Sequence, residues 1–205
     1  MVKHEPIEWG EIWVTGADDD SLPRLLLVGD SITRSYFDLV ETELKGSFLC
    51  ARLTTSTSVC DKGMKKELAL LLDNYKFSVI HFNNGLHGMG YDEKSYAKGF
   101  REVLAFIMRR SPGSRLIVAD STPMRRTDDL NTLDLTTNRV RERNRIIREI
   151  AAKRRLPVND LFTPVIDHPE HFSKDGVHFN PTGQSILGKQ VIQMVLAESH
   201  RMMAS

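Results

Sequence analysis

The chain has 205 residues, with 28 lysines and arginines against 27 aspartates and glutamates, and 40% of its residues are hydrophobic. These proportions are those of an ordinary globular protein and exclude a disordered chain, and the balanced charge gives no global field that would attract nucleic acid or an anionic membrane. No apolar run approaches the roughly 20 residues needed to span a bilayer.

Residues 1–23 contain three successive aspartates and two prolines. We expect an irregular N-terminal segment here, in which Trp9 and Trp13 pack onto the body of the protein. The opening residues MVKHEPIEWG contain no apolar stretch typical of a signal peptide, which fits either a cytoplasmic protein or an exported one whose signal has been removed. Residues 24–205 are predicted to form a single domain, because no linker rich in Gly, Pro or Ser divides them.

Apolar runs rich in β-branched residues alternate with segments of helical periodicity along the rest of the chain. The apolar runs predict strands over residues 25–29, 48–53, 78–83, 115–120 and 156–161, and the intervening segments predict helices over residues 36–44, 65–73, 93–110, 137–154 and 181–198. This alternation predicts an α/β fold, a three-layer αβα sandwich with about five parallel strands covered on both faces. Ligands of such sheets bind beyond the carboxyl ends of the strands, so the residues that follow each strand are the candidate site.

The first predicted strand leads directly into Gly29, Asp30 and Ser31. A serine at this position either caps the next helix or presents an exposed hydroxyl at the sheet edge. Near the carboxyl end, Asp175 and His178 lie three positions apart, just before the last helix. A carboxylate that orients a histidine, which in turn takes the proton of a serine, is the arrangement of a serine hydrolase triad. Ser31, Asp175 and His178 are therefore a candidate triad.

The block GDSIT at 29–33 together with DGVHF at 175–179 resembles the GDSL or SGNH hydrolases, a family of esterases, lipases, thioesterases and carbohydrate acetylesterases on a flavodoxin-like sheet. The similarity extends from Arg24 through the final helix. It implies that Ser31 is the nucleophile, His178 the general base and Asp175 its orienting partner.

Two further blocks depart from the pattern of this family. The family has a glycine after the second strand and a Gly-x-Asn-Asp run after the third, and both join the N–H group of the nucleophile, here Ser31, in binding the oxyanion. The second region here reads TTSTSVCDKG, with its only glycine close to the next helix, so Ser58 or a neighbour is the candidate donor. The third region reads FNNGLHG, and its candidate donor is either His87 or Asn84.

Together with the candidate triad, the resemblance implies a serine esterase that hydrolyses small O-acyl esters through an acyl-enzyme. The habit of the family and the polar, arginine-bearing rim favour acetyl esters of carbohydrates as the substrates. Arg34, one turn into the helix after Ser31, is either a substrate-binding residue or a solvated arginine. The five histidines other than His87 and His178 show no spacing typical of a metal site, and the chain has neither a Gly-rich phosphate loop nor a dinucleotide fingerprint, so no metal and no cofactor are expected.

The two altered family blocks keep open the alternative of a catalytically silent binding protein on the same fold. An acyltransferase is a second alternative, because it would use the same triad. The expected partner is a small-molecule or carbohydrate ester, with no nucleic acid and no membrane span. The acyl chain length, the alcohol portion, the oligomeric state and the compartment are not determined by the sequence.

Overall fold

In the computed structural model of the chain, the described residues are 5–203, with side chains described through residue 201. Residues 1–4 of the expected irregular segment therefore lie outside the described residues. Within residues 5–203, no helix is long and apolar enough to cross a membrane.

A single mixed sheet forms the centre of the molecule, with strand order β1-β3-β2-β4-β5-β6. All neighbouring strands are parallel except β1, which runs antiparallel to β3 at the edge. The strands are β1 (Gly10–Val14), β2 (Arg24–Gly29), β3 (Leu49–Thr55), β4 (Val79–Phe82), β5 (Arg115–Ala119) and β6 (Val158–Asn159). The predicted α/β class and the five parallel strands are confirmed.

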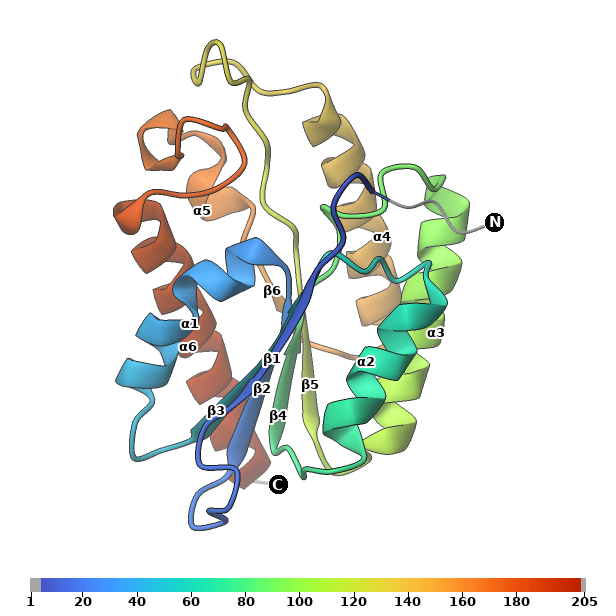
Figure 1. Cartoon of the computed structure of the whole chain (residues 1–205), viewed down its shortest axis with the longest axis vertical. Coiled ribbons are helices and arrows are strands. Elements are labelled where there is room, and N and C mark those ends of the chain that lie inside the picture. Colours follow the sequence, from blue (N-terminus) through green and yellow to red (C-terminus); the bar gives the residue numbers. More distant parts are fainter. Residues whose placement is uncertain (1–4, 204–205) are drawn as a thin grey trace.

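Helices cover both faces of this sheet. They are α1 (Ser31–Glu43), α2 (Lys62–Leu72), α3 (Glu93–Arg110), α4 (Thr136–Arg154), the short α5 (Thr163–Ile166) and α6 (Pro181–Met203), with a 3₁₀ turn at Pro169–His171. Figure 1 shows α1, α5 and α6 on one side of the sheet and α2, α3 and α4 on the other, which gives the predicted three layers.

The central strand β2 shows why these layers form. Its residues alternate between the two faces, and all are buried, so both faces must be covered. Leu25 and Leu27 pack with the apolar residues of α1 and α6, whereas Leu26 and Val28 pack with those of α2, α3 and α4. Strand β2 is thereby held rigidly from both sides, and it ends directly before Asp30 and Ser31.

Two elements differ from the sequence-based expectation. Residues 10–14, expected to be irregular, form the edge strand β1, because their backbone pairs with β3, about 40 residues further along the chain. The predicted strand at 156–161 is reduced to Val158–Asn159, because the Asp160 side chain accepts hydrogen bonds from the N–H groups of Phe162 and Thr163 and turns the chain. Of the two tryptophans, Trp9 is half-buried, whereas Trp13 is 53% exposed.

Candidate active site

The turn after β2 places Ser31 at the sheet edge. A Cβ atom at Gly29 would lie 2.0 Å from Thr33 Oγ1, so only glycine allows α1 to start this close to the strand. Asp30 is the N-cap of α1, and its carboxylate accepts a hydrogen bond of 2.9 Å from the N–H group of Ile32. Ser31 is the first residue of the helix, so its own N–H group has no acceptor within the helix.

The loop before α6 is built around Asp175. One carboxylate oxygen of Asp175 accepts hydrogen bonds of 2.9 Å from the N–H groups of both Val177 and His178. Asn180 then caps α6, accepting from the N–H groups of Thr182 and Gly183. This local network fixes the direction in which the His178 ring leaves the loop.

Ser31, His178 and Asp175 meet in one chain of hydrogen bonds. His178 Nε2 lies 2.8 Å from Ser31 Oγ, and His178 Nδ1 lies 2.7 Å from the second carboxylate oxygen of Asp175. An ionised carboxylate only accepts, so the neutral ring carries its proton on Nδ1 and accepts the Ser31 hydroxyl proton at Nε2. The His178 side chain is 44% exposed, so the group is open to a ligand from solvent.

Asp175 is held in its charged form. Burial acts to raise the pKa of this carboxyl group, but the hydrogen bonds from the His178 ring and from the N–H groups of Val177 and His178 outweigh it, and the pKa lies below its ordinary value. Asp175 is therefore an anion at neutral pH and can stabilise a positive charge on the His178 ring.

A pocket of about 370 Å³ opens directly above Ser31 and His178. Its lining combines charged and apolar side chains: Glu5, Trp9, Asp30, Ser31, Arg34, Leu86, His87, Met124, Val177 and His178. A larger pocket of about 540 Å³ lies between α2 and α3, but no histidine is among the described residues that line it. The smaller pocket is the one that holds a nucleophile and a base.

Ser58 does not lie in this pocket. Its N–H group donates to Asp61 at 3.1 Å, and its hydroxyl accepts from the N–H group of Cys60 at 3.2 Å. The neighbouring N–H groups of the second loop are also engaged: that of Ser56 with the Trp9 carbonyl, that of Thr57 with Thr55 Oγ1 and that of Val59 with the Asn84 side chain. In this conformation the backbone N–H groups of residues 56–60 all have acceptors.

Asn84 is also engaged elsewhere. Its side-chain oxygen accepts from the N–H group of Val59 at 3.0 Å, and its amide nitrogen donates to the carbonyl of Thr57 at 2.9 Å. The side chain is buried and joins the second loop to the third. Of the two alternatives in the third loop, His87 is the one that lines the pocket.

His87 is held by a residue from the N-terminal segment. Its Nδ1 lies 2.8 Å from a carboxylate oxygen of Glu5, and the edge of the Trp9 ring packs against the imidazole with the ring centroids 6.2 Å apart. Arg34 lies over the Trp9 ring at 5.0 Å and is 49% exposed, so its guanidinium stands at the rim of the pocket. The structure thus brings His87 and Arg34 to the same pocket as the candidate triad.

Sequence reasoning missed two buried arginines that shape the site. Arg143, fully buried in α4, donates to the carbonyls of Gly85, His87 and Gly88 at 2.8 to 2.9 Å. Arg125 is also buried, and its N–H group donates to the carbonyl of Gly176 at 2.7 Å. The sequence signal was weak in both cases, because an arginine in a polar helix or a basic pair usually faces solvent.

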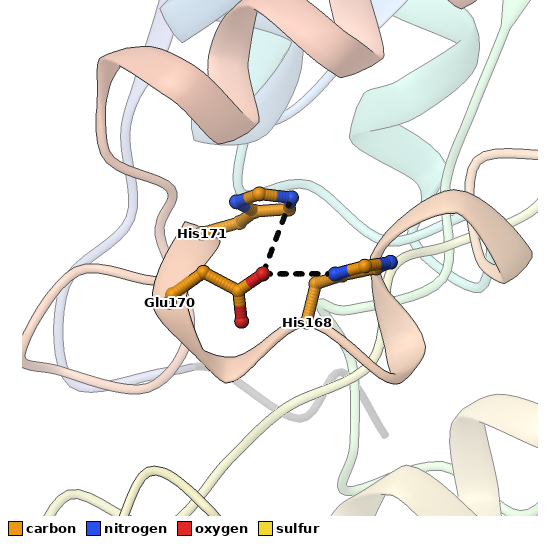
Figure 2. A group of neighbouring side chains, drawn as sticks. All are labelled: His168, Glu170 and His171. Carbon is orange, nitrogen blue, oxygen red and sulfur yellow. Dashed lines mark hydrogen bonds and ion pairs between the residues drawn. The ribbon is translucent and has the colours of Figure 1, made fainter.

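Three further ionisable side chains cluster on the 3₁₀ turn that precedes the Asp175 loop. Figure 2 shows that one Glu170 oxygen faces both imidazoles, at 2.9 Å from His168 Nδ1 and 3.8 Å from His171 Nε2. The two rings are stacked, with their planes 19° apart and their centroids separated by 4.8 Å. A metal ion binds in the plane of each imidazole ligand, and these nearly parallel planes do not converge on one point. The geometry is that of ion pairs and not of a formed metal centre.

Comparison with solved structures identifies the same fold in ester hydrolases. A member of the lipolytic G-D-S-L family from Veillonella parvula has a TM-score of 0.67 and 17% identity, covering 84% of this chain and 97% of that chain. A carbohydrate esterase family 3 protein from Talaromyces cellulolyticus has a TM-score of 0.68 and 16% identity, covering 85% and 97%. The acetyl xylan esterase AlAXEase has a TM-score of 0.67 and 18% identity, covering 84% and 99%. No curated protein matches the chain.

The fold and the family comparison identify the protein as an acylhydrolase. The chain belongs to the GDSL-like lipase/acylhydrolase family, whose model matches residues 72–186, more than half of its length. The matched segment includes Asp175 and His178 but not Ser31, which lies in the part of the chain before it.

Proposed function

We propose that the protein is a serine esterase in which Ser31 is the nucleophile, His178 the general base and Asp175 its orienting partner. The observation that carries this proposal is the continuous chain of hydrogen bonds of 2.8 and 2.7 Å that joins the three side chains. A nucleophile, a base and an orienting acid in this order are what ester hydrolysis by an acyl-enzyme requires.

In the first half-reaction, Ser31 Oγ attacks the ester carbonyl carbon while His178 Nε2 takes the hydroxyl proton. The tetrahedral oxyanion collapses, the bond to the alcohol breaks, and the leaving alcohol takes the proton from His178. In the second half, water attacks the acylated Ser31 and gives its proton to His178. The acid is then released and the proton returns to Ser31 Oγ.

The oxyanion needs donors, and the proposal assigns two. One is the N–H group of Ser31, which has no helical acceptor and lies at the positive end of the α1 dipole. The other is the ring of His87, which donates from Nε2 when both nitrogens are protonated. Removing one such donor typically lowers kcat by about 100- to 1,000-fold. Ser58 and Asn84 are not assigned this role, because their polar groups already have protein partners.

The pocket also favours a class of substrate. Leu86, Met124 and Val177 give it an apolar part, and a volume of about 370 Å³ suits a short acyl group with part of its alcohol. Arg34 and Trp9 form a rim that can bind hydroxyl groups and the face of a sugar ring. We therefore propose acetyl esters of carbohydrates as the substrates, in line with the carbohydrate esterase and acetyl xylan esterase among the proteins of similar fold.

The test is hydrolysis of p-nitrophenyl acetate by Ser31→Ala, with Ser35→Ala as the matched control on the same helix. Loss of the nucleophile should lower kcat by roughly 10⁴-fold or more, whereas Ser35→Ala should stay within about twofold of the unmodified protein. Turnover retained by Ser31→Ala would rule out the proposed nucleophile. The same assay with acetylated xylo-oligosaccharides and with octanoyl esters tests the substrate class: kcat/KM should be at least about tenfold higher for the acetyl esters.

A further inference from the structure

The N-terminal segment enters the sheet at the edge that carries the active site. Strand β1 is antiparallel to β3, with Gly10 opposite Thr55, so the residues before Gly10 lie beyond the carboxyl end of β3. Trp9 continues the pairing, because its carbonyl accepts from the N–H group of Ser56 at 3.0 Å and its own N–H group donates to Ser56 Oγ at 2.8 Å. Figure 1 shows this dark-blue segment at the end of the sheet where α1 begins.

Glu5 uses both carboxylate oxygens on one loop. One oxygen lies 2.8 Å from His87 Nδ1, and the other accepts from the N–H group of Gly88 at 2.8 Å. The Glu5 side chain is 31% exposed and that of His87 is 20% exposed, so the pair is largely shielded from solvent. Two neighbouring donors of the third loop thus share one carboxylate.

This contact determines which nitrogen of His87 faces a ligand. A carboxylate accepts and does not donate, so Nδ1 must carry a proton and Nε2 is left as the nitrogen available to a bound ester. On its other side the loop is fixed by Arg143, which donates to the carbonyls of His87 and Gly88. The backbone position is therefore set by Arg143, and the orientation of the ring is set by Glu5.

We propose that Glu5 is a positioning residue of the active site: its carboxylate accepts from Nδ1 of His87 and holds the ring with Nε2 free for the ligand, so that a ring protonated at both nitrogens donates from Nε2 to the oxyanion. This inference rests on the proposed function. The second loop supports this inference, because its backbone N–H groups at residues 56–60 already have acceptors. His87 is therefore the side chain that we assign as the oxyanion donor from these two loops. Glu5 acts through His87 and does not itself contact the reacting atoms.

The experiment compares Glu5→Ala and Glu5→Gln with Glu43→Gln, an exposed glutamate at the far end of α1. Steady-state kinetics with p-nitrophenyl acetate should show kcat lowered by about 10- to 100-fold in Glu5→Ala, because a displacement of the His87 ring by about 1 Å lowers the rate by this factor. KM should change by less than about threefold, and Glu43→Gln should match the unmodified protein. Thermal unfolding of each variant verifies that the fold is kept, and Glu5→Gln supplies a variant of the same size.

A second measurement reads the contact directly. Nitrogen-15 NMR of histidine-labelled protein should show His87 Nδ1 protonated and hydrogen-bonded in the unmodified chain, with this hydrogen bond lost in Glu5→Ala. Unchanged kcat in Glu5→Ala, or a His87 ring protonated only at Nε2 in the unmodified chain, would overturn the proposal. Failure of the proposed function looks different, because Ser31→Ala would then retain turnover, and the NMR measurement would still decide whether Glu5 holds the His87 ring at Nδ1.

Discussion

Gly176 shows how one residue sets the geometry of the candidate triad. Its φ is +69°, in the region that favours glycine, and a Cβ atom at this position would lie 2.1 Å from the carbonyl oxygen of Arg125. The Gly176 carbonyl accepts from the Arg125 N–H group at 2.7 Å, so the two loops are in direct backbone contact. The loop that carries Asp175 and His178 can therefore approach the sheet edge this closely only with a glycine at position 176.

Gly176→Ala should displace His178 from Ser31. Strain at the positive φ and the contact with Arg125 together should lower the free energy of unfolding by about 1–3 kcal/mol, and kcat for p-nitrophenyl acetate should fall by at least about tenfold. Gly113→Ala is the matched control, because its φ is not positive and nothing lies within 4 Å of the added Cβ. Equal activity of the two variants would contradict the role assigned to Gly176.

Residues of the candidate site differ in how far the sequence could predict them. Asp175 and His178 are three positions apart in a short loop, so their contact is a local property that spacing reveals. Asn84 instead bonds Thr57 and Val59, 25 to 27 residues away, and no sequence pattern shows that its amide is occupied. The same applies to Glu5 and His87, which are 82 residues apart.

At the scale of elements, α4 organises the third loop through a single side chain. Arg143 is fully buried, its guanidinium lies 4.5 Å from the centroid of the Tyr96 ring, and it donates to three loop carbonyls. Burial lowers the pKa of this guanidinium, but it stays protonated at neutral pH because an arginine pKa starts far above that range. Helix α4 and the loop before α3 are joined by this cation.

Arg143→Met should therefore destabilise the protein and disable the site. Methionine fills much of the same volume but leaves the carbonyls of Gly85 and His87 without the Arg143 donor and that of Gly88 with the Tyr91 N–H group, at a cost of about 3–5 kcal/mol in the free energy of unfolding. Urea unfolding measures this cost, and Arg141→Met, at an exposed position on the same helix, is the control with an expected change within about 0.5 kcal/mol. A matching midpoint in both variants would show that Arg143 does not hold the loop.

Elements were predictable from periodicity where they lie in the interior of the sheet. Strands β2 and β4 are buried throughout because both faces are covered, and their residues are apolar except Arg24 and His81, a pattern that is visible in the sequence. The edge strand β1 was not predicted, because GEIWV is short, is exposed at several positions and owes its conformation to pairing with β3. Its extension toward Glu5 was missed for the same reason.

At the scale of the whole molecule, the buried sheet contains a titratable group whose charge the fold excludes. His81 lies in β4 and is fully buried, and burial lowers its pKa to about 4 from an ordinary value of 6.5. Its Nε2 accepts from the Asn159 amide at 3.0 Å, which joins β4 to β6 across β5. The folded protein therefore keeps this ring neutral at a pH where the unfolded chain protonates it.

The contribution of His81 to the free energy of unfolding should consequently fall by roughly 3 kcal/mol as the pH decreases from about 6.5 to about 4. The stability that comes from a lowered histidine pKa is fully present above the pKa of the unfolded chain, and it is lost as the pH decreases to the pKa of the folded protein. Burial raises the pKa of Asp120 to about 6, although Arg148 acts to lower it. The contribution of Asp120 to stability therefore changes with pH in the opposite direction. This contribution is the same in every variant and cancels when the variants are compared.

Urea unfolding at a series of pH values tests this, with His81→Leu compared with His200→Leu. His200 is an exposed histidine of α6, so its variant should keep the slope of the unmodified protein. His81→Leu should be less stable at neutral pH, since Asn159 loses a partner, but its deficit relative to the unmodified protein should shrink by roughly 3 kcal/mol as the pH decreases from about 6.5 to about 4. An unchanged slope in His81→Leu would assign the acid sensitivity to other groups.

Labelling with a fluorophosphonate probe, followed by peptide mass spectrometry, tests whether His178 activates Ser31. The probe forms a covalent bond only with an activated serine, so we expect one adduct, on Ser31, and labelling at least about 100-fold slower in His178→Ala. Absence of an adduct in the unmodified protein, an adduct on another serine, or equal labelling of His178→Ala would contradict this activation.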